Sequence, residues 1–363
     1  MPMDAILVTG FPGFLASALV PRLLARAPYA EVVCLVQLQH AVLARQRVQE
    51  IVAAQPALDG RIAIVHGDVT QRGLGITDLE LPRRVTELFH LAAIYDLAVD
   101  RELALRVNVG GTQHALAFAR ACPRLARFHY VSTCFVSGRW RGTFLESQLE
   151  AGQTFNNPYE ESKYLAELEV RAAIRGGLSA TIYRPSVVVG DSVTGATQKY
   201  DGPYYVLQWL LRQPRTALMP VVKDDRRREF NMVPRDYVVD AIATLSGRLA
   251  SLGRTYALAD AAPLAVDELL ALLARATDRR LVRVPLRLGL AKAMLDHLPG
   301  AARLLRIPSE ALDYFVHPTH YDTANTRRDL AESGVACPPV SAYVDRLVAF
   351  IRAHPDIGPH AMR

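Results

Sequence analysis

Tyr159 and Lys163 stand four residues apart, and their types and spacing are those of a proton-transferring pair. If both lie on one helix, the i and i+4 side chains share a face, and the ammonium sits about 5 Å from the phenol. At that distance, in an effective dielectric of about 20, one positive charge favours the phenolate by roughly 3 kcal/mol, or about 2 pKa units. The tyrosine pKa would then approach the neutral range in which acid–base catalysis works.

Two further segments supply what such a pair would need. Ser132 and Thr133 place hydroxyl groups upstream of it, and a glycine-rich stretch occupies residues 9–16. A tyrosine and a lysine on an amphipathic helix are common by themselves, so these additional segments carry the interpretation. Together they predict hydride transfer between a nicotinamide and a carbonyl or alcohol, with the phenol moving the proton.

The first half of the chain alternates short apolar runs with helical patterns, which predicts a parallel sheet wound by crossover helices. The apolar runs are continuous rather than alternating, as expected for strands that are buried on both faces. The predicted strands are Ala5–Val8, Val32–Val36, Ile62–Val65, Glu87–Leu91, Arg127–Val131 and Ala180–Arg184. The predicted helices are Phe14–Arg26, Ala41–Ala54, Arg101–Ala121 and Tyr159–Arg175. We therefore expect an α/β fold, a Rossmann-type doubly wound parallel sheet.

After Gly190 this regularity ends, and a polar loop over residues 191–202 leads into a smaller, mostly helical region that we expect to bind the substrate. Gly253–Leu258 predicts one more strand that returns to the sheet. Further helices are predicted at Pro263–Arg275, Leu286–Leu305 and Ser341–His354. The predicted organisation is a dinucleotide-binding domain over 1–190 with 230–262 returning to it, a substrate-binding region over 191–229 and 263–335, and a C-terminal helix and tail over 336–363.

Composition excludes several classes of protein. The 363 residues carry a net charge of +6, without the Lys/Arg runs that are typical of a nucleic-acid surface. The four cysteines have neither metal-ligand nor paired spacing, so we expect reduced thiols and no metal site. A signal peptide is not expected, because Asp4 stands in place of a basic start and Gly10, Pro12 and Gly13 interrupt the first apolar run. No apolar stretch is long enough for a membrane span, and we expect a cytoplasmic protein.

The glycine-rich stretch has the features of a phosphate-binding loop. The first predicted strand runs directly into Thr9-Gly10-Phe11-Pro12-Gly13-Phe14-Leu15-Ala16, which opens the first predicted helix. Gly10 permits a tight turn, Gly13 lets the backbone approach a pyrophosphate, and the small Ala16 lets helix and strand pack closely. The amides and the positive dipole end of the helix N-terminus would face the phosphates. We therefore expect a dinucleotide cofactor.

The choice between NADP and NAD is predicted from the end of the second strand, where a carboxylate would bind an unmodified ribose. The chain has Val36-Gln37-Leu38-Gln39 there, without a carboxylate. Arg45 and Arg47 follow, and either could bind a 2′-phosphate, although both could equally belong to an exposed helix face. NADP is favoured, with NAD as the alternative.

These segments together resemble the extended short-chain dehydrogenase/reductase family. The matching motifs, in family order over roughly the first 190 residues, are Thr9–Ala16, Gly67–Val69, His90–Ala93, Asn108–Thr112, Val131–Thr133, Tyr159–Lys163 and Tyr183–Ser186. The resemblance implies that Tyr159 is the proton donor or acceptor and that Lys163 binds the nicotinamide ribose. Thr133 would orient the substrate oxygen, with Ser132 as the alternative. Asn108 would help to position the helix or a proton-relay water, and a helix-packing role is the equal alternative.

The resemblance also implies a set of cofactor contacts, in which Asp68 and Val69 flank the adenine and Pro185–Val188 border the nicotinamide. The expected cofactor-binding residues are Thr9, Gly10, Pro12, Gly13, Phe14, Leu15, Gln37, Arg45, Asp68, Val69, Leu91, Ala92, Ala93, Tyr159, Lys163, Pro185, Ser186, Val187 and Val188. A finer similarity is to the fatty acyl and thioester reductase branch, also called male-sterility-like. The motifs that carry it are Cys34–Val36, Gly67–Thr70, Leu74–Gly75, Asn157–Tyr159 and Gly190–Ser192. Gln37 stands where members of that branch often have an arginine.

The leading hypothesis is an NAD(P)-dependent oxidoreductase that reduces an acyl thioester, aldehyde or ketone. An apolar substrate tail is suggested by Tyr204–Leu211 and by the leucine-rich segment after Leu286, which could also be ordinary core. The alternative enzyme is a nucleotide-sugar epimerase or dehydratase with tightly bound cofactor. A cofactor-sensing protein without catalysis is disfavoured by the intact Thr133, Tyr159 and Lys163. The resemblance further implies a possible homodimer through the helices that bear Asn108 and Tyr159.

Overall fold

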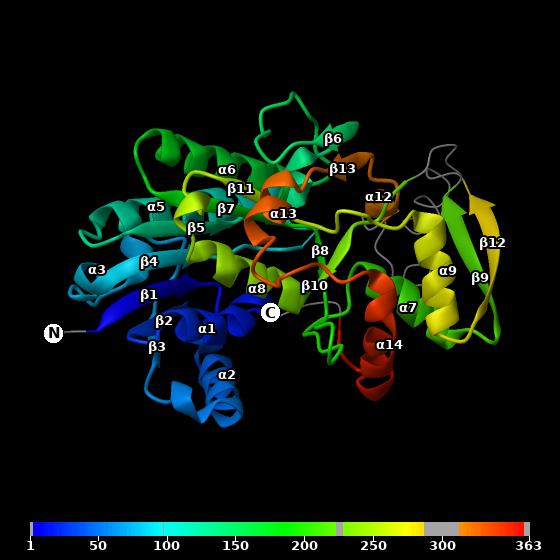
Figure 1. The fold of residues 1–363 in the computed structure, drawn as a ribbon, viewed down its shortest axis with the longest axis horizontal. Helices are drawn as coiled ribbons and strands as arrows, with labels where there is room; N and C mark the ends of the chain where they lie inside the picture. Colours follow the sequence, from blue (N-terminus) through cyan, green and yellow to red (C-terminus); the bar gives the residue numbers. More distant parts are fainter. Residues whose placement is uncertain (1–2, 97, 223–227, 287–311, 359–363) are drawn as a thin grey trace.

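A parallel sheet of seven strands forms the centre of the molecule in the computed structural model, which describes residues 3–96, 98–222, 228–286 and 312–358 (Figure 1). The strand order is β11-β7-β5-β4-β1-β2-β3, and every neighbouring pair is parallel. The strands are β1 Asp4–Thr9, β2 Ala30–Val36, β3 Ile62–His66, β4 Val85–His90, β5 Arg127–Val131, β7 Ala180–Pro185 and β11 Thr255–Leu258. The predicted α/β, Rossmann-type fold is confirmed.

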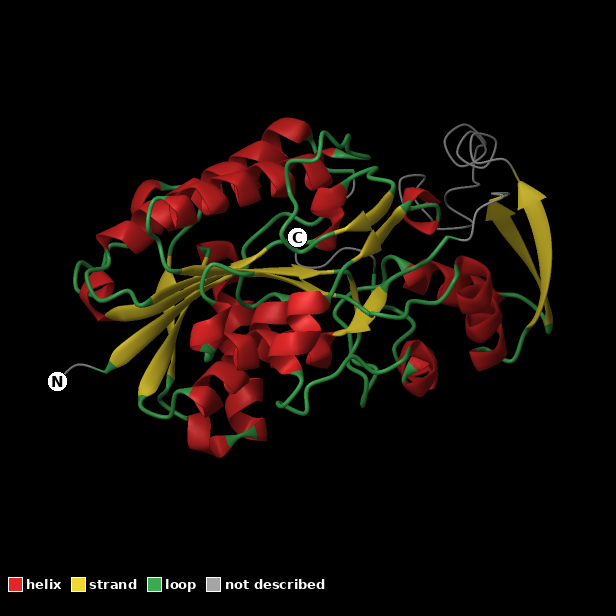
Figure 2. Cartoon of the chain, turned by 45° about the horizontal axis from the view of Figure 1, so that its top comes forward, coloured by secondary structure: helices red, strands yellow, loops and turns green. Residues whose placement is uncertain are grey.

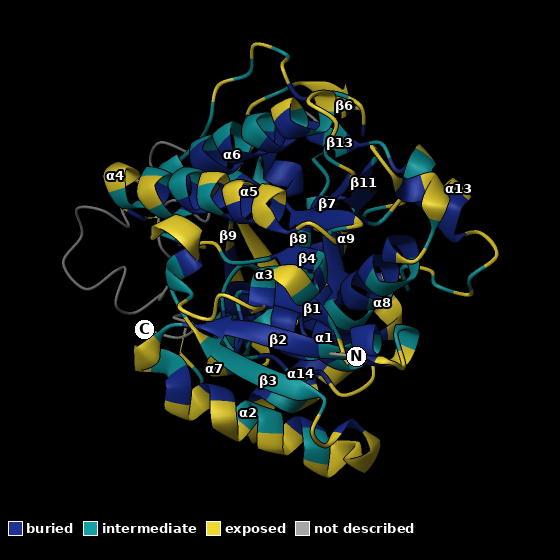
Figure 3. Cartoon of the chain, turned by 90° about the vertical axis from the view of Figure 1, so that its left-hand side faces the viewer, coloured by how far each residue is buried: buried dark blue, intermediate teal, exposed yellow. Residues whose placement is uncertain are grey.

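Helices cover both faces of this sheet (Figure 2). One face carries α1 Phe14–Arg26, α2 Ala41–Ala54 and α8 Arg235–Ser246, and the other carries α5 Gly111–Ala121 and α6 Pro158–Arg175. Successive residues of β1 alternate between the two cores: Ile6 and Val8 pack on the α1 side, and Ala5 and Leu7 on the α5 side. This double burial explains the continuous apolar runs in the sequence. Figure 3 shows the buried strands between helices whose outer faces are exposed.

The predicted strands and helices of the first half all occur, with small shifts at their ends. The largest difference concerns the predicted helix Arg101–Ala121. It is a short α4 Arg101–Ala104, a π-helical turn Leu105–Gly110 and then α5. A π-helical turn adds a residue to the turn and is often found at functional positions, but it leaves no periodicity in a sequence.

The described helices of the second half, besides α8, are α7 Pro203–Arg212, α9 Val266–Ala276, α12 Leu312–Phe315, α13 Ala324–Leu330 and α14 Val344–Ala353. The structure also contains more strands than predicted. Three parallel strand pairs were not predicted: β8 Val187–Val189 with β10 Met232–Pro234, β9 Thr216–Val222 with β12 Arg280–Leu286, and β6 Gly142–Phe144 with β13 Thr319–Tyr321. A short α3 Leu81–Arg84 precedes β4. The predicted helix Leu286–Leu305 lies, apart from its first residue, outside the described residues.

No helix in the described ranges combines the length and the apolar character needed to cross a membrane. The apolar side chains of α7 suggested a pocket for an apolar substrate tail. In the structure, Tyr204 and Leu207 belong instead to a separate apolar core that they share with α9 and α14. Of the two explanations open from the sequence, ordinary packing is therefore the correct one for α7.

A buried ion pair joins α6 to β7. The Arg184 guanidinium binds both carboxylate oxygens of Glu167, at 2.6 Å from Nη2 and 3.0 Å from Nε. Arg184 is 2% exposed and Glu167 is 0% exposed. Arg171, one turn further along α6, donates to the same carboxylate at 3.0 Å. Such bidentate geometry supplies the hydrogen bonds that a buried carboxylate needs.

Replacement of Arg184 by the similarly long Met should lower the free energy of unfolding by about 3 kcal/mol, because Glu167 then stays buried with incomplete compensation. Urea titration of wild type and variant measures the difference. Arg83→Met breaks the exposed Arg83–Glu80 pair, whose side chains are 70% and 68% exposed, and serves as the control. The control should change stability by less than about 0.5 kcal/mol. Equal effects of the two substitutions would contradict the assignment of Arg184.

Candidate active site

Thr133, Tyr159 and Lys163 meet at the carboxyl end of β5. Their exposed fractions are 4%, 6% and 3%. Asn157 caps the N-terminus of α6 by accepting from the Glu160 amide at 3.0 Å, which places Tyr159 in the first helical turn. Lys163 lies one turn later, and its Nζ donates to the Val131 carbonyl at 2.8 Å. The Tyr159 phenol hydrogen-bonds the Thr133 side chain.

The electrostatics of the pair differ from the prediction. Burial raises the pKa of Tyr159, the hydrogen bond with Thr133 opposes the rise, and the carboxylates of Glu160 and Asp201 add to it. Burial lowers the pKa of Lys163 to about 7, with Glu167 opposing. The expectation that the ammonium makes the phenol acidic is therefore wrong in this structure. The lysine is directed to a strand carbonyl, and desolvation outweighs the charge that the spacing suggested.

Ser132 and Thr133, the two candidate hydroxyls, have different partners. Ser132 Oγ donates to Glu167 Oε2 at 2.7 Å and so belongs to the buried ion pair. Thr133 Oγ1 lies 3.4 Å from the Pro185 carbonyl and accepts from the Phe135 amide at 3.3 Å. The hydroxyl beside the Tyr159 phenol is thus that of Thr133.

Asn108 uses its whole amide to hold neighbouring elements together. Its Oδ1 accepts from the Ile94 amide at 2.8 Å, and its Nδ2 donates to the Ile94 carbonyl at 3.2 Å and to Ser162 Oγ at 2.9 Å. The side chain is 1% exposed. Of the two roles considered from the sequence, these contacts favour positioning, because they fix the loop after β4 against α6.

The glycine-rich loop passes close to the loop after β4. Gly10 has a φ of +88°, and a Cβ there would lie 2.8 Å from the Ala92 amide nitrogen. Thr9 Oγ1 accepts from the amides of Leu91 and Ala92 at 3.2 and 3.0 Å. Only glycine suits such a conformation and such an approach. Gly13 then precedes the first turn of α1. The loop geometry fits a dinucleotide pyrophosphate.

His90 supports this loop and was noted in the sequence only as part of a motif. Its Nδ1 lies 2.9 Å from Thr9 Oγ1 and its Nε2 3.1 Å from Thr112 Oγ1. Burial lowers the pKa of His90 to about 3, and the Lys163 charge adds to the effect. The ring is therefore neutral, and it serves as a hydrogen-bonding link between the loop and α5.

The predicted adenine end contains a polar cluster after β2 and β3. Gln37 Nε2 donates to Asp68 Oδ2 at 2.8 Å, and Asp68 Oδ1 accepts from the amide and the hydroxyl of Thr70, each at 2.8 Å. Arg47 pairs with Glu50 at 2.7 Å, while Arg45 is exposed on α2. Of the two arginines, Arg45 is therefore the more exposed.

Beyond β7, Ser186 is 5% exposed, and its hydroxyl has no hydrogen-bond partner within the described ranges. Val187 follows in β8 and lines a pocket. A buried, unpaired hydroxyl at the predicted nicotinamide border, together with the close approach at Gly10, shows that the residues present fit a nicotinamide dinucleotide.

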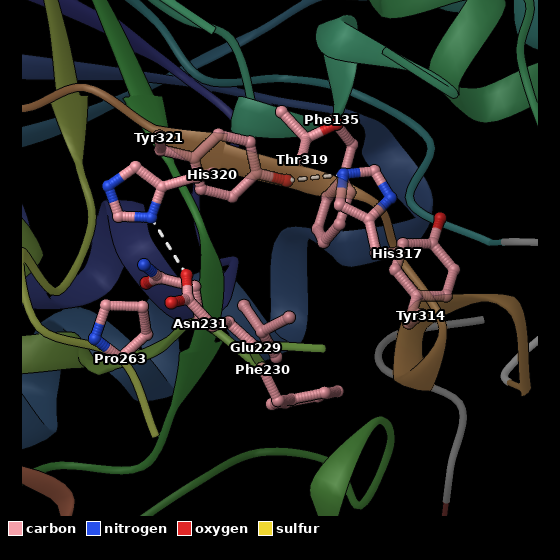
Figure 4. A pocket seen from close by; sticks show the side chains of 11 residues that line it. Phe135, Glu229, Phe230, Asn231, Pro263, Tyr314, His317, Thr319, His320 and Tyr321 are labelled. Atoms are coloured by element: carbon pink, nitrogen blue, oxygen red, sulfur yellow. Dashed lines mark hydrogen bonds and ion pairs between the residues drawn. The ribbon is translucent and has the colours of Figure 1, made fainter. Parts of the chain in front are cut away.

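The pocket lies next to these residues and has aromatic and polar sides (Figure 4). Its wall includes the rings of Phe135, Phe230, Tyr314 and Tyr321. Its polar lining residues are Glu229, Asn231, His317, Thr319 and His320. Apart from Val187, sequence reasoning missed all of these residues. They come from separate segments with no recognisable spacing.

Residues 8–242 match the family described as male sterility protein. The chain is similar to the non-canonical nonribosomal peptide synthetase cpsA of Aspergillus campestris, with 29% identity over 270 residues, covering 69% of this chain and 25% of that protein. It is 28% identical over 172 residues to the alcohol-forming fatty acyl-CoA reductase of Simmondsia chinensis, covering 42% of this chain and 35% of that protein. The chain thus spans only about a quarter to a third of these relatives.

Among solved structures, the chain is similar to the terminal R domain of the myxalamid PKS-NRPS pathway, with a TM-score of 0.80, 29% identity, and coverage of 100% of this chain and 93% of that one. A UDP-glucuronic acid 4-epimerase from Bacillus cereus in complex with NAD has a TM-score of 0.66 and 17% identity, with 96% of each chain covered. The epimerase shares the fold alone.

Gly10→Ala should raise the dissociation constant for NADPH at least about tenfold and lower stability by roughly 1–3 kcal/mol, because the new Cβ meets the Ala92 backbone and φ is positive. NADPH fluorescence titration and urea unfolding measure the two effects. Gly60→Ala is the matched control, since Gly60 has a φ of +72° with nothing within 4 Å of its Cβ position. Unchanged NADPH affinity in Gly10→Ala would contradict the assignment of the glycine-rich loop to the cofactor pyrophosphate.

The lowered pKa of Lys163 predicts a pH dependence of stability. Between the native pKa of about 7 and the ordinary value of about 10.4, the unfolded chain binds a proton that the native state lacks. This group therefore increases stability as pH rises, by at most about 1.4 kcal/mol per pH unit. Lys163→Met removes the contribution, so the stability difference between wild type and variant should shift in favour of wild type from pH 6.5 to 9.5. Urea unfolding at four pH values measures it, and parallel profiles would refute it.

Proposed function

Because the chain belongs to the male sterility protein family of extended short-chain dehydrogenases/reductases, we propose that it is an NAD(P)-dependent reductase of acyl thioesters or aldehydes. The observation that carries this proposal is the meeting of Thr133, Tyr159 and Lys163 beside the dinucleotide loop. The name of the fatty acyl-CoA reductase from Simmondsia chinensis supports the thioester. The similarity to a terminal R domain at 29% identity over the whole chain supports a reductase as well.

Tyr159 is the proton donor in the proposed reaction. Burial raises the pKa of its phenol, so the group holds its proton at neutral pH and gives it up only to the strongly basic oxygen that forms during hydride transfer. Thr133, hydrogen-bonded to the same phenol, is placed to orient that oxygen. When bound, a nicotinamide dinucleotide supplies the hydride.

Lys163 serves this reaction through its lowered pKa. A lysine whose pKa is lowered to about 7 by burial is a stronger acid than the Tyr159 phenol and would return a proton to it after turnover. Its charge also contributes to the lowered pKa of His90, the ring that is hydrogen-bonded to Thr9 of the glycine-rich loop. This position suits the ribose contact that the family resemblance implies.

Four finer expectations remain predictions of this proposal: NADP rather than NAD, an apolar portion in the substrate, a homodimer and a cytoplasmic location. NADP is favoured by the absence of a carboxylate at Gln37 and by the exposed Arg45. Comparison of kcat/KM for NADPH and NADH tests the cofactor preference. Light scattering after size-exclusion chromatography reports the oligomeric state.

Purified protein should oxidise NADPH when an acyl-CoA or a long-chain aldehyde is added. Tyr159→Phe should lower kcat by about 10²–10⁴-fold with NADPH affinity unchanged, since the proton donor is lost and the ring remains. Thr133→Val should lower kcat in the same way, whereas Ser132→Ala should lower stability more than kcat because its hydroxyl binds Glu167.

A nucleotide-sugar epimerase would give a different result: turnover of a nucleotide sugar without net cofactor oxidation. That outcome, or a Tyr159→Phe variant that reduces carbonyl substrates at the wild-type rate, would overturn the proposed function. Absorbance at the nicotinamide band and fluorescence titration separate loss of chemistry from loss of binding.

A further inference from the structure

Lys163 lies over the aromatic ring of Tyr130, a contact to which the proposed reaction gives no role. The Lys163 Nζ is 4.5 Å from the centroid of that ring, within the range of a cation–π interaction. The two residues are 3% and 1% exposed, so water does not compete for the ammonium. Because a desolvated contact of this kind is stronger than one at the surface, the ring is placed to bind the charged form of Lys163.

The Tyr130 ring is held in place by its neighbours. Tyr130 stands opposite His90 in the register of β4 and β5, and the two rings stack with centroids 5.9 Å apart and an angle of 25° between their planes. His90 is in turn hydrogen-bonded to the side chains of Thr9 and Thr112. Since the ring is already ordered, no cost of fixing it offsets its attraction for the ammonium.

The carboxylate nearest in sequence gives Lys163 limited support. Burial lowers the pKa of Lys163 to about 7, and the charge of Glu167, one turn further along α6, opposes the change. The Glu167 carboxylate, however, also binds the guanidinium groups of Arg184 and Arg171. Their positive charges offset its negative charge, so the attraction that remains for a third cation is reduced.

The other titratable groups around Lys163 supply no negative charge. His90 is neutral, because burial and the Lys163 charge lower its pKa to about 3. Tyr159, one turn earlier on α6, keeps its proton because burial raises its pKa. In the part of the chain that the structure describes, the contacts that favour the ammonium, besides Glu167, are therefore the Val131 carbonyl and the Tyr130 ring.

We propose that Tyr130 is a positioning residue for Lys163, whose ring binds the ammonium and keeps this side chain charged during turnover. An ammonium has three N–H donors. One is directed to the Val131 carbonyl and the ring face accepts a second, so a third is left for the ribose contact that the family resemblance implies. The inference rests on the proposed function, in which a charged Lys163 returns a proton to Tyr159.

Fluorination of the ring tests the interaction while the packing is kept. Tyr130→Phe retains the ring, and phenylalanines with one, two or three ring fluorines at this position retain its shape but withdraw electron density from its face. The chain contains four lysines, so NMR of lysine labelled at Cε resolves Lys163, and Lys163→Met assigns its resonance. The pKa of Lys163 should fall stepwise with fluorine content, by about 1 over the series, as the attraction of the ring is removed.

Phe128 offers a matched control. It is buried in the same apolar cluster as Tyr130, two residues earlier on β5, and the same fluorinated series there should leave the pKa of Lys163 unchanged. Lys199 lies over the Tyr95 ring at 3.8 Å and serves as an internal reference, because substitutions at position 130 should not alter its titration. Urea unfolding verifies that each variant is folded.

The same variants connect the contact with turnover. In NADPH-dependent carbonyl reduction, kcat should fall at high pH as Lys163 loses its proton, and this fall should move to lower pH together with the Lys163 titration. A constant pKa of Lys163 across the series, or a kcat profile that does not follow it, would overturn the inference but leave the proposed function standing. If the wild type reduces no carbonyl compound, the proposed function itself fails, and with it the role of Tyr130 in turnover.

Discussion

The buried contact between Glu167 and Arg184 is the constraint on which the rest of the site depends. Burial by itself would raise the pKa of Glu167, but the Arg184 charge and hydrogen bonds bring it below its ordinary value, so the carboxylate stays ionised. The carboxylate then fixes α6 against β7 and accepts a hydrogen bond from the Ser132 hydroxyl. As a consequence, Ser132 is engaged by Glu167, and Thr133 is the hydroxyl beside Tyr159. Lys163 donates to the Val131 carbonyl at the end of β5.

Desolvation, rather than attraction between neighbouring charges, determines the protonation of the site. Tyr159 and Lys163 are both almost completely buried, and burial penalises phenolate and ammonium alike. The result is a protonated acid next to a lysine that titrates near neutrality. Neither side chain is among the causes of the other's pKa shift, so the helical spacing of the two residues does not determine their protonation.

The central sheet could be predicted because its signals are local. Runs such as Ala5–Val8 are apolar on both faces, and the loop that begins at Gly10 follows directly on the first strand. The pairing of β9 with β12 joins segments that begin at Thr216 and Arg280, and a single sequence contains no signal for such a distant partner. The residues that line the pocket could not be predicted for the same reason. The segment around Glu229 and the segment Tyr314–Tyr321 are far apart in the sequence, and only the fold brings them together. The phenol pKa was mispredicted because helix spacing reports proximity and not desolvation.

The pocket and the chemistry come from different parts of the chain. Thr133, Tyr159 and Lys163 belong to the sheet and its crossover helix, whereas Tyr314, His317 and Tyr321 come from a late segment that crosses over to pair with β6. Substitutions in that late segment would therefore alter the lining of the pocket without touching the elements that carry the candidate catalytic groups, so the two parts can change independently.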